Sequence, residues 1–422
     1  MNVHVHEFPE QSMRWLFVAG VLCLLPVVFL PIVLGNFDPM HSTRWLLLMG
    51  SCWAMAAIGG KRGLWEVNKP VTVFAVYLIV WQVTLRLDST YFLAYFLPAL
   101  AAILAYPYLS SIDRLGKERV CEWLVLLGVL ESLMMIGQRL SLILPPWKAF
   151  GLTWPAFYFP PLQIFGRSWL LFYPLDPGQI GRAVGTFTGT NPAAVFLAVV
   201  AVLTLGIRKG WAFFVILPAL FLTNCIGGLL AACIGLIYFS WRVDLGSILH
   251  RRRVLAMVWA AMVVVLLAAM VIHGWVDNHR LEVWRMAFSA WFGGSAVPEG
   301  ARLPMAWYRN PIIGWGPGSF AMLFPMLYQP LTSAAQVGGS WTNMHNEYLQ
   351  VLWEYGLVGA GLLGWFMVRL WQRIRADSDL FGIALRGAVI AVAVDSLVFY
   401  PFQILETGLL ALTMVAFLEE GE

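Results

Sequence analysis

A histidine stands where a long polar segment gives way to an apolar one, in the run NMHNEYLQ at 343–350. An imidazole has an unperturbed pKa of about 6.5, so it can take a proton from a hydroxyl near neutral pH. We expect His345 in the first turn of a helix, with its ring facing an aqueous space. General-base chemistry is one interpretation of this position. The other is a helix-end histidine satisfied by a loop carbonyl, and the residues alone do not separate the two.

Arg182 lies in a glycine-rich stretch, GRAVGTFTGTNP at 181–192, that leads into an apolar segment. Asn191 is a natural N-cap residue and Pro192 suits the first helical position, so this stretch predicts a helix N-terminus. Backbone N–H groups at such a terminus favour an anion, and the planar fork of an arginine suits phosphate oxygens. The sequence therefore predicts a phosphate contact at Arg182. The alternative is an arginine that snorkels to lipid headgroups.

Arg285 falls in a segment that is expected to form a helix beginning near Asn278. Apolar residues recur there at helical spacing and predict an amphipathic helix lying on a membrane surface: Leu281, Trp284, Phe288 and Trp291. Glu282 precedes Arg285 by three residues, so an intrahelical ion pair competes with ligand binding. Four other arginines are weaker candidates for the same ligand: Arg167, Arg280, Arg302 and Arg309.

The composition places these residues in a membrane protein. Of 422 residues, 60% are hydrophobic and 12% are charged, whereas about 25% are charged in an ordinary soluble domain. A net charge of +4 gives no case for nucleic-acid binding. The five cysteines lack metal-binding or disulfide spacing and are interpreted as core residues. The predicted fold is an all-α integral membrane protein with one membrane domain over 1–422.

Apolar windows predict about twelve transmembrane helices. No small-residue cleavage site follows the first window, so we expect no removable signal peptide. The windows lie near 15–34, 45–58, 70–85, 91–109, 120–140, 191–207, 211–224, 226–240, 254–272, 348–368, 381–397 and 402–418.

Lysine and arginine are concentrated in alternate connections between these windows, which hold more than half of the 27 cationic residues. Because basic residues near the ends of spans stay in the cytoplasm, both termini and these connections are expected inside. Two long connections, 145–190 and 273–345, then face outward, and we expect short helices in them. Loops of that length are usually functional. Their many aromatic residues are expected to form an interfacial belt, with sugar stacking as an alternative for a few rings.

Charged residues also occur within the apolar windows. On a continuous helix, Glu354 would lie on the opposite face from His345 and roughly 13 Å deeper, so it is expected to fix helix packing. The same question of an intramembrane charge arises at Glu131, Arg386, Asp395 and Glu406. The run NPIIGWGPGSF at 310–320 is rich in turn residues, and its glycines permit close backbone approach. It is not a Walker loop.

Three of these segments together resemble the O-antigen ligase and polymerase superfamily of bacterial membrane glycosyltransferases, which are GT-C-like enzymes. The segments are Arg182 with Gly185 and Asn191, the run at 310–320, and His345-Asn346 leading to Leu349, Glu354 and Gly356. Together the three segments cover the carboxy-terminal two thirds of the chain. Their order along the chain is a more specific signal than any one of them. The resemblance implies a twelve-span protein of the bacterial inner membrane. Such a protein moves a glycan from undecaprenyl pyrophosphate to an acceptor on the periplasmic face.

The resemblance also implies roles for particular residues. His345 would assist the acceptor hydroxyl as general base or orienting group, while Arg182 and Arg285 hold the pyrophosphate. Arginines that neutralise this leaving group replace a metal ion, so no metal and no cofactor is expected. Displacement in one step would invert the sugar carbon. Further substrate contacts are expected from Arg167, Arg280, Arg302, Arg309, Asn346 and Asn191. Similar proteins often have Ser-Arg where this chain has TNCIGG at 223–228, so a role for that arginine does not carry over.

The acceptor is less constrained than the donor. Ligation to lipid A-core, polymerisation of repeat units and attachment to a protein hydroxyl share this architecture. Protein-glycosylating relatives often possess a long soluble tail, and this sequence shows none. We therefore favour a lipopolysaccharide ligase with lipid A-core as the acceptor. A proton-coupled transporter that uses the intramembrane carboxylates is a second class, although the sequence shows no paired broken helices. A non-catalytic membrane scaffold is a third.

Overall fold

The computed structural model describes residues 8–22, 39–58, 68–85, 97–143, 162–164, 167–169, 183, 185, 187, 189–243, 263–264, 278–291, 311–321, 343–375 and 379–419. Most of the two long connections at 145–190 and 273–345 lies outside these residues. Three of the predicted site residues lie outside them as well: Arg182, Arg302 and Arg309.

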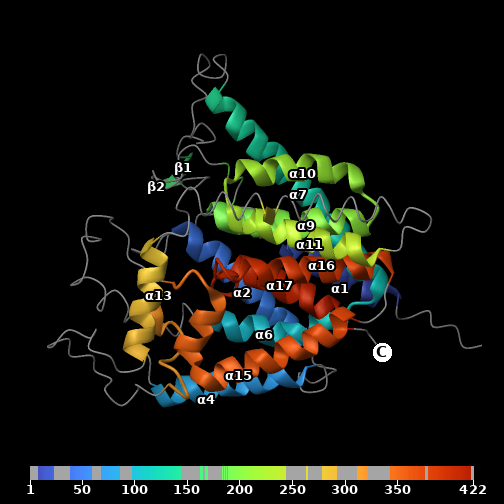
Figure 1. Ribbon diagram of the computed structural model, residues 1–422. Helices are drawn as coiled ribbons and strands as arrows, with labels where there is room; N and C mark the ends of the chain where they lie inside the picture. The colour runs from blue at the N-terminus through green and yellow to red at the C-terminus, as the bar shows by residue number, and fades with distance from the viewer. Residues whose placement is uncertain are drawn as a thin grey trace, which may run out of the picture.

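The described residues are almost entirely helical, which confirms the all-α class (Figure 1). Their α-helices are α1 (Phe8–Leu22), α2 (Pro39–Ile58), α4 (Lys69–Leu85), α6 (Leu97–Ser110), α7 (Arg114–Ile143), α9 (Thr190–Gly206), α10 (Gly210–Leu222), α11 (Ile226–Arg242), α13 (Asn278–Trp291), α15 (Glu347–Arg375), α16 (Leu380–Asp395) and α17 (Leu405–Phe417). A 3₁₀ turn, η6 (Pro401–Gln403), precedes α17. The described part of the first long connection forms an antiparallel hairpin of β1 (Leu162–Ile164) and β2 (Arg167–Trp169), where a short helix was expected.

Every predicted apolar window except 254–272 overlaps one of these helices, and that window lies almost wholly outside the described residues. Two stretches, Arg114–Gly137 and Glu347–Ile374, are long and apolar enough to cross a membrane by length and composition. The other apolar stretches found among the described residues, such as Leu47–Ile58 within α2, have 10–17 residues, against the roughly 20 that a hydrocarbon core requires. Twelve transmembrane helices therefore remain a prediction.

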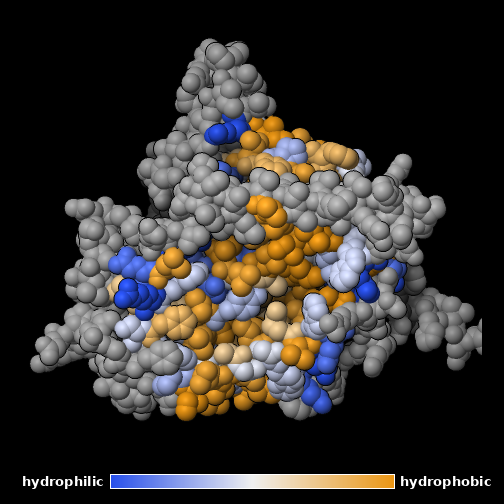
Figure 2. Space-filling view, in the orientation of Figure 1, coloured by the Kyte–Doolittle hydropathy of each residue, from blue (hydrophilic) through white to orange (hydrophobic). Residues whose placement is uncertain are grey.

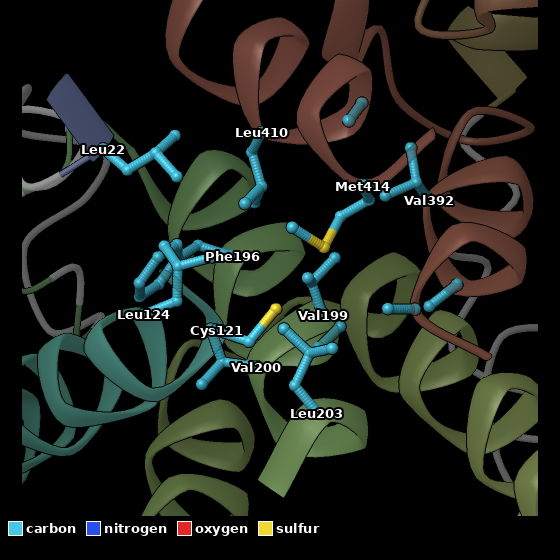
Figure 3. Packing of buried hydrophobic residues seen from close by; sticks show 14 of the residues in the cluster. Leu22, Cys121, Leu124, Phe196, Val199, Val200, Leu203, Val392, Leu410 and Met414 are labelled. Atoms are coloured by element: carbon cyan, nitrogen blue, oxygen red, sulfur yellow. The ribbon is translucent and has the colours of Figure 1, made fainter. Parts of the chain in front are cut away.

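Helix α9 forms the centre of the fold because its sequence is apolar on every side. It packs against α7, α10, α11, α16 and α17, and Figure 1 shows it in the middle of the helices. Phe196, Val200 and Leu203 of α9 belong to the same buried cluster as Leu124 of α7 and Met414 of α17 (Figure 3). The N-terminus of α9 is thereby held at a fixed place relative to its neighbours.

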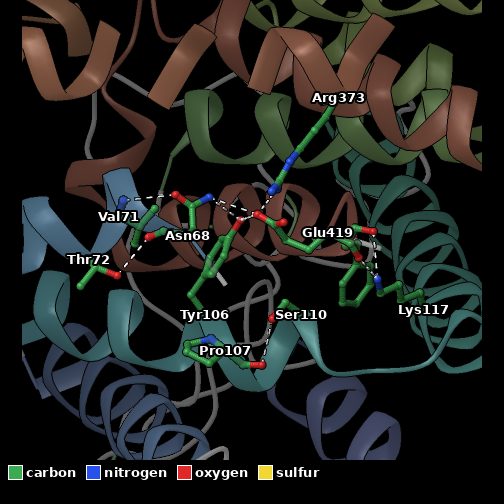
Figure 4. Close-up of polar contacts among 10 residues, drawn as sticks. Asn68, Val71, Thr72, Tyr106, Pro107, Ser110, Lys117, Arg373 and Glu419 are labelled. Atoms are coloured by element: carbon green, nitrogen blue, oxygen red, sulfur yellow. Dashed lines mark hydrogen bonds and ion pairs between the residues drawn. The ribbon is translucent and has the colours of Figure 1, made fainter. Parts of the chain in front are cut away.

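Polar contacts join the ends of α4, α6, α7, α15 and α17 at one end of the helices (Figure 4). The Glu419 carboxylate accepts hydrogen bonds from the Tyr106 hydroxyl (2.6 Å) and from Asn68 Nδ2 (3.1 Å), and it forms an ion pair with Arg373. Lys117 Nζ donates to the backbone oxygen of Glu419 (2.5 Å). Several of the connections predicted to be cytoplasmic therefore lie together.

Helix α15 is interrupted at Gly356, where the sequence predicted a continuous span over 348–368. The backbone of Gly356 has φ 62° and ψ −160°, and residues 311–316 fill the break. The amides of Trp315 and Gly316 bind the last carbonyls of the first half, and the carbonyls of residues 311 and 312 bind the first amides of the second half. The four bonds are Trp315 N to Trp353 O (3.0 Å), Gly316 N to Glu354 O (2.7 Å), Leu357 N to Pro311 O (3.0 Å) and Val358 N to Ile312 O (2.9 Å). The break thus leaves these backbone groups hydrogen-bonded.

Two glycines make this close approach possible. A Cβ atom on Gly314 would lie 2.4 Å from the Gly356 nitrogen, and one on Gly356 would lie 2.4 Å from the Gly314 nitrogen. Both residues also have positive φ, which side chains disfavour. The glycine-rich run at 310–320 therefore serves, in its described part, to pack one backbone against another.

Helix α13 packs against this same region, and its start at Asn278 agrees with the prediction. Its buried face is formed by Val283, Ala287 and Trp291, which cluster with Trp315 and Trp353. The predicted stripe was to face a membrane surface. Leu281 and Phe288 are exposed, whereas Trp284 and Trp291 pack against the protein instead.

Candidate functional site

The residues that follow α16 form a turn, 395–402, on which several predicted site residues converge. Asn346 Nδ2 donates to the carbonyl of Leu397 (2.9 Å). The Glu347 amide faces the carbonyls of Ser396 (2.9 Å) and Phe399 (3.1 Å), and a Glu347 carboxylate oxygen accepts from the amide of Phe402 (3.1 Å). We call residues 395–402 the site turn. The N-terminus of α15 is thereby fixed to it.

His345 lies beside the site turn, two residues before α15 begins. The predicted place in the first turn of the helix is therefore corrected, because Asn346 is the residue that caps α15: its Oδ1 accepts from the Leu349 amide (3.0 Å). The His345 ring packs edge-on against Tyr400, with 4.9 Å between ring centroids and 80° between planes. The backbone of His345 has φ 51°, a left-handed conformation that is uncommon for a residue with a side chain.

Tyr400 carries a phenol close to the imidazole. Burial raises the pKa of the Tyr400 hydroxyl, while a hydrogen bond with the Asn343 side chain and the positive charge of Arg280 act in the opposite direction. With burial the largest of these effects, the hydroxyl is neutral near pH 7. Tyr400 therefore presents a neutral ring to His345, while its hydroxyl is bonded with the Asn343 side chain.

Arg280 reaches the site turn from α13. Its Nη1 donates to the carbonyl of Val398 (3.1 Å). The guanidinium is also within electrostatic range of the Asp395 carboxylate and of Tyr400. Asp395 is 1% exposed. A weak candidate by sequence, Arg280 thus reaches the same turn as His345, and Tyr400 feels its charge.

The N-termini of α9 and α11 complete the surroundings of the site turn. Asn191 was predicted as the N-cap of its helix, but α9 begins at Thr190 with Gly189 as the N-cap, so Asn191 lies inside the first turn. Its Oδ1 accepts instead from the Cys225 thiol (3.2 Å). Burial raises the pKa of that thiol to about 12, so it keeps its proton. Two residues later, a Cβ on Gly227 would lie 3.2 Å from an Asp395 carboxylate oxygen, which shows how closely α11 approaches the site turn.

The N-termini of α11 and α15 therefore lie at one turn that His345, Asn346 and Arg280 also contact, and the N-terminus of α9 reaches α11 through Asn191. No protein-family model matches the chain, and no curated protein matches it either. What the site does must then be argued from its chemistry.

The other predicted arginines are not brought to this turn by the described residues. Arg285 is on the exposed face of α13, with Leu281 and Phe288. Arg167 lies in β2, opposite Ile164. Arg182, Arg302 and Arg309 lie outside the described residues. Among the described residues, no three His, Cys, Asp or Glu side chains gather where a metal ion would bind.

Sequence reasoning missed Tyr400 and Gln350 and treated Asp395 only as a buried charge. Each becomes visible as part of the site only through contacts between segments that are far apart in the chain. The signal present in the sequence was the run Tyr400-Pro401, which ends one apolar window and starts the next.

An apolar cavity of about 250 Å³ begins beside the site turn and is lined by α4, α6, α15, α16 and α17. Ser396 and Phe402 lie at the end nearest the site, and Pro70 and Leu370 lie toward the Glu419 network. Two of its polar lining groups are bonded within the protein: the Tyr348 hydroxyl donates to the Ala393 carbonyl (2.8 Å), and the Ser396 hydroxyl donates to the Val392 carbonyl (2.9 Å). Glu347 and Glu354 also contribute to the lining. The cavity still offers mainly hydrocarbon surface.

Proposed function

We propose that this protein is a membrane glycosyltransferase of the O-antigen ligase type. It transfers a glycan from undecaprenyl pyrophosphate to a sugar hydroxyl of lipid A-core at the periplasmic face of a bacterial inner membrane, without a metal ion. The observation that carries the proposal is the convergence of His345, Asn346 and Arg280 on the site turn, beside the N-termini of α11 and α15. A guanidinium suits a diphosphate, and an imidazole suits a hydroxyl.

The exposed side chains support a membrane location. Large apolar side chains are exposed along several helices, including Phe214 (77%), Trp241 (68%) and Val368 (56%). Soluble monomers rarely expose contiguous apolar patches of such extent. In Figure 2, hydrophobic residues fill the middle of the face, and hydrophilic residues gather near α13 and near the C-terminus. This pattern supports a membrane location. The topology we propose has twelve spans, with both termini cytoplasmic and the site turn near the opposite, periplasmic surface.

The proposed mechanism is a single displacement. His345 accepts the proton of the acceptor hydroxyl as the oxygen attacks the anomeric carbon, and the bond from that carbon to the pyrophosphate oxygen breaks. Inversion at the sugar follows from attack opposite the leaving group. Arg285, exposed on α13, and Arg182 hold the pyrophosphate, while Arg280, Asn346 and Asn191 order the site around it. The further arginines Arg167, Arg302 and Arg309 are proposed to contact the glycan or its phosphates.

The apolar cavity supports a lipid-linked donor. A polyprenyl chain has no hydrogen-bonding groups, so a hydrocarbon-lined space that opens beside the diphosphate site is suited to accept it. Membrane lipids and the acyl chains of the acceptor are the other hydrocarbon partners expected around the helices.

The test is transfer by the purified protein in liposomes, with undecaprenyl pyrophosphate glycan as donor and lipid A-core as acceptor. His345→Ala is expected to reduce the rate at least about 100-fold, the contribution typical of a general base. Ser240→Ala, a buried change in α11, is the matched control. Wild-type transfer only to a protein, or only lengthening of the carrier-bound glycan, would instead identify the oligosaccharyltransferase or polymerase of the same type.

A proton-coupled transporter is the second candidate, because α15 is broken beside the buried Glu354, and broken helices line many transport sites. Glu354→Gln and Asp395→Asn would then abolish substrate movement across liposomes, while His345→Ala would leave it intact. The opposite pattern supports the transferase.

A further inference from the structure

The backbone of Met344, the residue before His345, is held from two sides. Its amide donates to Gln350 Oε1 (2.8 Å), and its carbonyl accepts from the indole Nε1 of Trp284 in α13 (2.7 Å). Met344 is 3% exposed. Two different helices therefore fix the peptide that leads into the histidine.

Gln350 is itself held in one orientation. Its Nε2 donates to Glu354 Oε1 (2.8 Å), one helical turn further along α15, and both side chains are 1% exposed. An amide flipped by 180° would present its oxygen to the carboxylate and its NH₂ group to the Met344 N–H, so neither bond would form. The amides of Gly318 and Phe320 approach the same carboxylate. Glu354 thus ties Gln350 to the segment that fills the break in α15.

Glu354 was expected to fix helix packing rather than to orient His345 directly. The carboxylate does lie deeper in the protein, as the helix geometry predicts. It reaches the loop before the helix indirectly, through Gln350 and the Met344 amide. The break at Gly356 leaves this part of α15 as a short unit that is joined to α13 and to residues 311–320.

We propose that Gln350 is a positioning residue for His345. A left-handed backbone at a residue other than glycine is costly and persists only where the surroundings enforce it. The Gln350 bond to the Met344 amide, together with the indole of Trp284, supplies that enforcement. The imidazole is then presented to Tyr400 and to the acceptor hydroxyl in one geometry. This inference rests on the proposed transferase function.

The decisive variant is Gln350→Met, which keeps the length of the side chain and removes both hydrogen bonds. We expect kcat for glycan transfer to fall by about tenfold or more while KM for the donor stays within about twofold, because an interaction that acts only on the reacting geometry is lost. Glu354→Gln keeps an acceptor for Gln350 Nε2 and is expected to retain transfer within about threefold. Thr413→Val, which removes a buried hydroxyl bonded to the Leu409 carbonyl, is the control for a lost polar group elsewhere.

A second measurement does not depend on the activity. Hydrogen–deuterium exchange of the Met344 amide is expected to be about tenfold faster or more in folded Gln350→Met, because its acceptor is gone. The Leu349 amide, bound by Asn346, is the internal reference. Unchanged exchange at Met344 would overturn the positioning role. So would unchanged kcat in Gln350→Met when His345→Ala abolishes transfer. Faster exchange together with full activity in His345→Ala would instead refute the proposed function and leave the structural coupling established.

Discussion

At the residue scale, the two arginines of α13 have different surroundings and therefore different expected roles. Arg280 is partly buried, donates to the Val398 carbonyl and faces Asp395 and Tyr400. Arg285 is exposed on another face of the same helix. Arg280 is suited to order the site turn, and Arg285 is suited to meet a ligand that arrives from outside.

Lysine substitutions separate these roles. Arg280→Lys loses the planar fork that serves Val398, Asp395 and Tyr400 together, so we expect transfer to fall by about tenfold, the loss typical of a hydrogen bond to a charged group. Arg285→Lys keeps a mobile positive charge for phosphate, so its transfer rate is expected to stay within about threefold of wild type. The rate of Arg285→Ala is expected to fall further. The measurement is the initial transfer rate in liposomes. Equal losses in the two lysine variants would contradict this division.

At the element scale, the interruption of α15 decides how the site is built. The first half of the helix carries Asn346, Gln350 and Glu354, and it connects to the site turn and α13. The second half continues toward the Glu419 network. Figure 1 shows the two halves running in different directions. The segment at 311–316 joins them through four backbone hydrogen bonds, and the close backbone approach that these require is why glycines are needed at two facing positions.

Alanine at either facing glycine is expected to destabilise the protein. In Gly356→Ala or Gly314→Ala, a Cβ would meet backbone atoms at 2.4 Å in a residue with positive φ, and we expect a loss of about 1–3 kcal/mol or more. Gly361→Ala, in the same helix with nothing within 4 Å, is the matched control and is expected to be neutral. Thermal unfolding in detergent measures both. A Gly356→Ala protein as stable as Gly361→Ala would show that the close approach of the two backbones is not needed for stability.

The cavity between α4, α6 and α15–α17 gives another prediction at this scale. Ala102→Phe places a ring in the cavity, and it is expected to raise KM for the undecaprenyl donor by about tenfold while a donor with a short prenyl chain is used as before. Ala57→Phe, on an exposed position of α2, is the control. The measurement is KM for donors with long and with short prenyl chains. Equal effects on both donors would show that the prenyl chain binds elsewhere.

The helices were predictable from the sequence, but their junctions were not. Continuous apolar runs indicate buried helices such as α9, because a helix enclosed on all sides must be apolar on all sides. The break at Gly356 depends on residues some forty positions earlier, and no periodicity within α15 reveals it. Asn191 was misplaced because its neighbours Gly189 and Thr190 also permit a helix start. Arg280 and Tyr400 join His345 through contacts that only tertiary packing creates.

At the scale of the whole molecule, polar networks mark both ends of the helices. One end has the Glu419 network, and the other has the site turn. The alternation of cationic connections predicts such a sorting, since helices that traverse the fold in turn bring every second connection to the same end. Which end is cytoplasmic stays a prediction. The specific partners of Glu419 were not predictable, because Asn68, Tyr106 and Arg373 come from three different helices or their ends.

The ion pairs at the Glu419 end are expected to contribute unequally to the free energy of unfolding. Glu419→Ala leaves Arg373 without this partner in a partly buried place and removes the acceptor for Tyr106 and Asn68, so we expect roughly 1–3 kcal/mol of destabilisation. Arg114→Ala removes an exposed pair with Asp379 and should change stability by less than about 1 kcal/mol. Thermal unfolding of the two variants under the same conditions compares them. A larger loss of stability in Arg114→Ala than in Glu419→Ala would contradict this expectation.

The site turn also sets the order in which the protein matures. Glu347 and Phe402, which hydrogen-bond across the site, are 55 residues apart in the chain. At about 5–20 residues per second, the ribosome needs roughly three to eleven seconds to make the second after the first. During that interval His345 and its neighbours lack their contacts with residues 395–402, even if every earlier helix is already inserted. Under the proposed function, nascent chains arrested before residue 395 are expected to be membrane-integrated yet inactive in glycan transfer, so synthesis of the last residues would set when activity begins.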